Sequence, residues 1–133
     1  QKVLADKAIY DRNTGQITAI GHVVLITETN DTYYSDKAVL EKGMHHAIVE
    51  HLEGILKQRS WVVADEGERL DEHTFVLKNS VFSPCPIPLC YIREQLGLAR
   101  EARPLWRVRS SQTTLDNTSE RIIHKHAFLD FMN

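Results

Sequence analysis

The chain has 133 residues, 42% of them hydrophobic and 26% charged, which is enough apolar material for one domain with a core. Its 16 basic and 18 acidic residues give a net charge of −2, and this balance excludes the basic excess typical of nucleic-acid-binding proteins. The longest unbroken apolar run, Val23–Ile26, is far shorter than the roughly 20 residues of a membrane-spanning helix. Because the sequence opens at Gln1 and stops abruptly at Asn133, we expect it to be a segment of a longer protein.

A short pattern recurs along the chain and predicts repeated units. Ala5–Ala8 (Ala-Asp-Lys-Ala) returns as Ser35–Ala38, more weakly as Ala64–Gly67 and faintly as Ser110–Thr113. Each copy leads into a polar turn, and each turn is followed by a second apolar run. We therefore predict four strand–turn–strand units that bury one face against their neighbours, since a single unit of this size cannot bury its own apolar face.

The second apolar runs share a register of their own. They align on Gly21-His22-Val23, Glu50-His51-Leu52, Asn79-Ser80-Val81 and Lys125-His126-Ala127. Apolar residues alternate at period two in these runs, as in β-strands with one buried face. The pattern predicts an all-β fold, a rolled antiparallel sheet of the β-roll, jelly-roll or sandwich type.

All four prolines lie between residues 84 and 104, in a segment that also carries both cysteines. Proline cannot donate to a strand ladder, so we predict an inserted loop at about 84–104, with a short helix within Tyr91–Arg100 as one option. Cys85 and Cys90 are too few for a four-ligand zinc site on their own. They are either a disulfide or two reduced thiols, and composition leaves both open.

Two sets of residues in this sequence carry a family resemblance. Ala5–Asp11 followed by Ile17–Leu25 resembles the OstA-like periplasmic domains of the lipopolysaccharide transport proteins LptA, LptC and LptD. Leu77–Cys85, and Pro104–Arg109 followed by residues 122–131, are similar to the N-terminal domain of the LptD family in particular. The four residues between Cys85 and Cys90, and the long loop after them, depart from the LptD pattern.

The resemblance implies a fold, a function and partners. Residues 1–133 would form a single periplasmic OstA-type β-jelly roll at the outer membrane, and the C-terminal outer-membrane barrel of the full protein would be absent from this sequence. The domain would bind lipopolysaccharide, receive it from an LptA-like bridge by edge-strand addition at Lys2–Tyr10, and pass it to the barrel and an LptE-like lipoprotein. Cys85 and Cys90 would form disulfides with each other or with the barrel. No catalysis and no cofactor are expected.

An apolar lining is what acyl chains require, because burying each CH₂ is worth about 0.8 kcal/mol. Together with the resemblance, the period-two pattern selects these lining candidates: Ile17, Ala19, Val23, Leu25, Ile48, Leu52, Leu56, Leu77, Val81, Ile123, Ala127, Leu129 and Phe131. The alternative is that these side chains fill a closed core, as they do in small rolled sheets.

Other functions compete with this interpretation. A free-standing LptA-like bridge and a structural or adhesive β-repeat module with a closed core remain open. Asp6, Asp36 and Asp65 recur at one strand position, where paired carboxylates can serve a glycosidase, although recurrence in a repeat favours a structural role. His22, His51 and His126 share a register, but the apolar residue after each favours a solvated face over a metal site.

Overall fold

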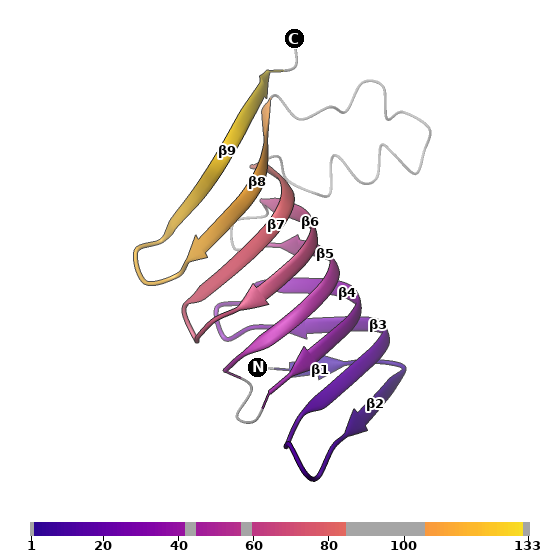
Figure 1. Ribbon diagram of the computed structural model, residues 1–133. Coiled ribbons are helices and arrows are strands. Elements are labelled where there is room, and N and C mark those ends of the chain that lie inside the picture. Colours follow the sequence, from indigo (N-terminus) through magenta and orange to yellow (C-terminus); the bar gives the residue numbers. More distant parts are fainter. Residues whose placement is uncertain (1, 42–44, 57–59, 85–105, 132–133) are drawn as a thin grey trace, which may run out of the picture.

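The computed structural model describes residues 2–41, 45–56, 60–84 and 106–131. All regular structure in these ranges belongs to one nine-stranded antiparallel sheet, so the all-β expectation is confirmed (Figure 1). The strands are β1 (Lys2–Leu4), β2 (Lys7–Tyr10), β3 (Ile17–Ile26), β4 (Thr32–Leu40), β5 (Ala47–Ile55), β6 (Trp61–Arg69), β7 (Thr74–Ser83), β8 (Trp106–Asp116) and β9 (Arg121–Phe131). Within these ranges, no helix is long and apolar enough to cross a membrane. Nearly all of the predicted insertion at 84–104, including the optional helix, lies outside the described residues.

Four hairpins supply eight of the nine strands, and they are the four predicted strand–turn–strand units; the ninth strand, β1, pairs with β3. β2 pairs with β3, β4 with β5, β6 with β7, and β8 with β9. Antiparallel pairs between consecutive hairpins join them in sequence order, so that the strands follow one another along an elongated body (Figure 1). From β2 to β9 each strand therefore pairs with the next one along the chain, which is the simplest way for a repeat to extend a core.

The turns of three hairpins begin with an aspartate that organises the backbone. Asp71 Oδ1 accepts the N–H groups of His73 and Thr74, each at 2.8 Å, and Asp11 and Asp116 likewise accept the N–H two residues further on. Short acidic side chains favour turns because they can form these local bonds. The bond from His73 is the main reason why the pKa of Asp71 lies below its usual range.

Each hairpin carries a backbone bend at its second strand, which we call the crease. His22, His51, Asn79 and His126 have φ between 46° and 52°, a left-handed conformation that L-residues seldom adopt. The inward face changes parity at this point: on β5, for example, Val49 and Leu52 are both buried, although they are three residues apart. The crease thus folds the sheet over on itself, with the same side of the sheet facing inward in both halves.

The crease divides the sheet into two leaves. The first leaf comprises residues 7–10, 17–20, 37–40, 47–50, 66–69, 74–78, 112–116 and 121–125, and the second comprises residues 2–4, 23–26, 32–35, 52–55, 61–64, 80–83, 106–110 and 127–131. This division explains why β1 and β2 both pair with β3. β2 extends the first leaf and β1 the second, and the chain crosses the crease between them at Asp6.

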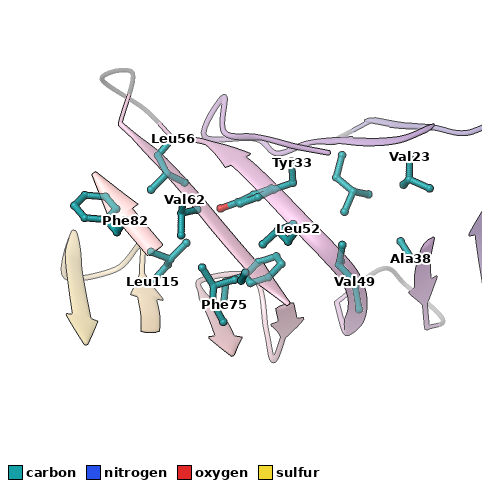
Figure 2. Packing of buried hydrophobic residues seen from close by; sticks show 14 of the residues in the cluster. Val23, Tyr33, Ala38, Val49, Leu52, Leu56, Val62, Phe75, Phe82 and Leu115 are labelled. Atoms are coloured by element: carbon teal, nitrogen blue, oxygen red, sulfur yellow. The ribbon is translucent and has the colours of Figure 1, made fainter. Parts of the chain in front are cut away.

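The core lies between the two leaves, whose apolar side chains point toward each other (Figure 2). Tyr33 of the second leaf stacks on Phe75 of the first, with ring centroids 5.0 Å apart. Two glycines make room for this pair: a Cβ on Gly67 would lie 2.4 Å from Phe75 Cε1, and one on Gly54 would lie 2.8 Å from the Tyr33 ring. Close packing of this kind holds the two leaves against each other.

Plain alternation places Ile48 and Leu52 of β5 on the same face. The change of the inward face at the crease places them on opposite faces and predicts different losses of stability when each is truncated. Leu52 is 1% exposed and Ile48 is 37% exposed. We expect Leu52→Ala to lower the free energy of unfolding by about 2–5 kcal/mol, because it leaves a cavity in the core. Ile48→Ala, the matched control, should cost less than about 1 kcal/mol. Urea unfolding followed by circular dichroism measures both, and equal losses would contradict the inward face assigned here.

Candidate lipid-binding interior

Two rows of inward side chains run along the crease, one in each leaf. Residues directly opposite one another on paired strands share a face, so the strand registers define each row. The first-leaf row is Ala8, Ala19, Ala38, Val49, Gly67, Leu77, Thr113 and His124. In the second leaf, the registers pair Val23 with Ser35, Leu52 with Ala64, and Ser110 with both Ser80 and Ala127, and the burial of Ser35, Leu52, Ala64 and Ser80 joins these pairs into one row: Val23, Ser35, Leu52, Ala64, Ser80, Ser110 and Ala127. The interior is therefore one continuous track that crosses the sheet from β2 to β9.

Most of the predicted lining residues belong to this interior. Ala19, Val23, Leu25, Leu52, Leu56 and Leu77 are buried in the core. Ile17 is partly buried and packs against the core. Ala127, Leu129 and Phe131 lie opposite Ser110, Val108 and Trp106 on β8, which places them on the inward side of β9. Their contact with lipid stays a prediction.

Three of the candidates lie on the outer face instead, and their predicted inward position was wrong. Ile48, Val81 and Ile123 were placed by uniform alternation, which the crease interrupts at His51, Asn79 and His126. Ile48 and Ile123 are exposed, and Val81 is half-buried. The alignment of the third unit was also one residue late: Asn79, and not Ser80, has the left-handed backbone of the histidines in the other units.

The interior opens at β9, because no further described strand pairs with this edge. Leu129 lies directly opposite Val108, which is 5% exposed, yet Leu129 itself is 57% exposed and Phe131 is 70% exposed. At the other end, Tyr10 on β2 lies opposite the half-buried Ile17 and is also exposed. Inward apolar side chains are thus uncovered at both ends of the sheet, and these are surfaces that another apolar group can cover.

Between its ends the interior is filled by its own side chains. Val23, Val49, Val62 and Leu77 have no exposed surface. A cavity of about 100 Å³ opens beside the Tyr33–Phe75 pair, well below the roughly 300 Å³ at which pockets for organic ligands begin. From β3 to β8 the alternative of a closed core therefore describes the packing, and preformed apolar surface is found at the ends.

The recurring aspartates lie on the outer side of the crease, in a polar row that crosses the sheet. Nδ1 of His22 lies 2.7 Å from Asp6 Oδ2, and Nδ1 of His51 lies 3.1 Å from Asp36 Oδ2. In the third unit, the side-chain amide of Asn79 donates to Asp65 at 3.1 Å. Each carboxylate is therefore paired with the bent residue of the neighbouring strand.

These pairs recur at the same position of the first three units, which indicates a structural role at the crease. All six side chains are exposed. Among the described residues, no three His, Cys, Asp or Glu side chains are placed to hold one metal ion. Cys85 and Cys90 lie outside the described residues, so the disulfide options stay predictions.

His22 and His124 lie on opposite sides of the crease, and their pKa values should shift in opposite directions from the ordinary value of about 6.5. The hydrogen bond that His22 makes to the Asp6 carboxylate raises the pKa of His22, whereas burial lowers the pKa of His124. The stability contributed by the His22–Asp6 pair is present in full below the unfolded pKa and is lost as the pH rises through the raised, folded pKa.

We expect Asp6→Asn to return the pKa of His22 toward its ordinary value and to leave that of His124 lowered. A pH titration of the two histidine side chains by NMR measures both. A His22 pKa that does not fall in the variant would contradict the assigned pairing.

No protein-family sequence model matches this chain, and no curated protein sequence matches it significantly. Solved structures do match. LptH from Pseudomonas aeruginosa, described as the LptA-homologous periplasmic component of the conserved lipopolysaccharide transport device, superposes with a TM-score of 0.70 at 10% sequence identity. The match covers 99% of this chain and 94% of the LptH chain. The fold is therefore the β-jelly roll of that protein, with a sheet that does not close.

Proposed function

We propose that this chain is a periplasmic lipid-transfer domain that binds the acyl chains of lipopolysaccharide on the inward face of its folded sheet. The observation that carries the proposal is the apolar interior that runs to β9 and is uncovered there, at Leu129 and Phe131. The fold shared with LptH over nearly the whole chain and the resemblance of Ala5–Asp11 and Ile17–Leu25 to OstA-like domains support it.

The physical basis is the cost of leaving these side chains in water. An acyl chain laid over β9 covers apolar surface on both partners and gains about 0.8 kcal/mol for each CH₂ buried. Deeper passage requires the two leaves to separate, since the interior is filled between β3 and β8. The strand pairs run within each leaf, so separation exchanges side-chain contacts for lipid contacts and leaves the hydrogen-bonded ladders intact.

The partners follow from the two edges of the sheet. In our proposal, an LptA-like bridge protein adds a strand to the edge formed by β1 and β2, and lipid leaves at the β9 end toward an outer-membrane barrel and an LptE-like lipoprotein. Open edges present unpaired N–H and C=O groups that accept such strands. We favour an LptD-like domain over a free-standing bridge, because the resemblance of Leu77–Cys85 and Pro104–Arg109 is to the LptD family.

Neighbouring positions of β9 provide the test. Leu129 points inward and Phe128 outward, and the two have similar exposure, 57% and 65%. With a photo-crosslinking residue at position 129, we expect a covalent adduct with purified lipopolysaccharide, detected by immunoblot. The same residue at position 128 should give several-fold less adduct, because position 128 lies on the outer face, where Arg109 of the neighbouring strand β8 lies over the Phe128 ring.

A second pair of positions controls for nonspecific labelling. His22 and His51 are exposed on the outer side of the crease and should give no adduct. Equal crosslinking at 128 and 129, or none at either, would contradict lipid binding at this face. Absence of any adduct would instead favour a structural β-repeat module with a closed core.

A further inference from the structure

Three hydroxyl side chains meet inside the fold, next to the open end of the interior. Ser80 Oγ lies 2.8 Å from Ser110 Oγ and 2.5 Å from Thr113 Oγ1, and the last two oxygens are 2.6 Å apart. Nδ1 of His124 lies 2.8 Å from Thr113 Oγ1 and 3.4 Å from Ser110 Oγ. We call these four residues the hydroxyl cluster. Ser80 and Thr113 are almost completely buried, so the cluster is part of the interior.

The cluster interrupts an otherwise apolar track at one place. In the two rows along the crease, β3 to β6 contribute Ala, Val, Leu and Gly, with the single exception of Ser35. The Ser35 hydroxyl shares its single proton between the backbone carbonyls of Lys37 and Glu50 and accepts the N–H of Lys37, so its hydrogen bonds are made with the sheet backbone. The hydroxyls of the cluster bond instead to one another and to a histidine, which are partners that a ligand can exchange.

The cluster is reached from β9 and has apolar neighbours along the track. His124 is half-buried, and Ala127, opposite Ser110 on the edge strand, is exposed. The Phe82 ring is tilted against His124, with centroids 5.6 Å apart, and Leu77 lies opposite Thr113. A ligand that enters over the inward face of β9 therefore meets apolar surface, then this polar group, then apolar surface again.

The chemistry of the cluster selects a neutral polar group. A hydroxyl donates one hydrogen bond and accepts two, so three hydroxyls that donate around a ring still have lone pairs free for a donor. No lysine or arginine belongs to the cluster, and burial lowers the pKa of His124, which keeps the imidazole neutral at pH 7. A buried anion without a paired cation is strongly disfavoured, which argues against a carboxylate or phosphate here.

We propose that the hydroxyl cluster is a binding site for a hydroxyl group carried on an acyl chain, so that the interior prefers hydroxylated over plain fatty acyl chains. The proposal rests on the lipid-transfer function above and specifies its substrate class. The acyl hydroxyl joins the Ser110–Thr113–His124 hydrogen bonds, and the CH₂ groups on either side lie against the apolar residues of the track. A plain chain leaves the cluster without this partner.

Binding of two soluble probes tests the preference. Tetradecanoic acid and 7-hydroxytetradecanoic acid differ by one oxygen, which lies well away from the carboxylate, and their affinities for the full chain are compared by displacement of an apolar fluorescent dye below micelle-forming concentrations. We expect the hydroxy acid to bind about 3- to 10-fold more tightly, as one net hydrogen bond allows. In Ser110→Ala/Thr113→Val, which keeps side-chain volume nearly constant, that ratio should fall to 1 or below.

Two further variants keep the test sharp. Thr113→Ser keeps a hydroxyl at this position and should retain the preference for the hydroxy acid. Ser111→Ala removes an exposed hydroxyl from the outer side of the same strand and should leave the ratio of affinities unchanged. Thermal unfolding checks that each variant folds. Equal affinities for the two acids in the native chain, or a preference that persists in the double variant, would contradict the proposed hydroxyl-binding site without contradicting the lipid-transfer function. Failure of both acids to bind would overturn the proposed function itself.

Discussion

A left-handed backbone residue in the middle of each hairpin is the constraint on which the rest of this structure depends. His22, His51, Asn79 and His126 each reverse the alternation of their strand, so that buried residues lie on the same side of the sheet before and after the bend. Without this reversal, the residues that face inward in one half of a strand would share their face with residues that face outward in the other half. With it, one sheet supplies both layers of its own core, and no second sheet is needed.

The polar row on the outer side of the crease accompanies this bend in the first three units. Asp6, Asp36 and Asp65 approach the bent residue from the neighbouring strand, with hydrogen bonds of 2.7–3.1 Å. Exposed pairs of this kind contribute little stability one by one. These pairs instead hold the side chain of the bent residue in place where the backbone is least regular. They recur because the bend recurs.

A folded sheet that adds one hairpin at a time has ends, and the ends are where this protein differs from a closed core. Inward side chains such as Val49 and Leu52 are buried on β5, whereas Ala127, Leu129 and Phe131 are exposed on β9, the last described strand of the sheet. The composition of the rows changes in the same direction, from aliphatic side chains to the serine, threonine and histidine of the hydroxyl cluster. The interior is thus graded along its length.

The sequence by itself determined the strands, the turns and the four-unit repeat, because these depend on neighbours along the chain: alternating apolar residues, and aspartates such as Asp11 and Asp71 that bond to the backbone two residues on. It also indicated the recurrence of Asp6, Asp36 and Asp65. Only the tertiary structure decided which face of each strand is inward. The left-handed residues shift the alternation by one within a strand, and plain periodicity therefore misplaced Ile48, Val81 and Ile123. The hydroxyl cluster could not be predicted from the sequence for a related reason. Ser80 and Thr113 are 33 residues apart and come into contact only because the crease turns both side chains inward.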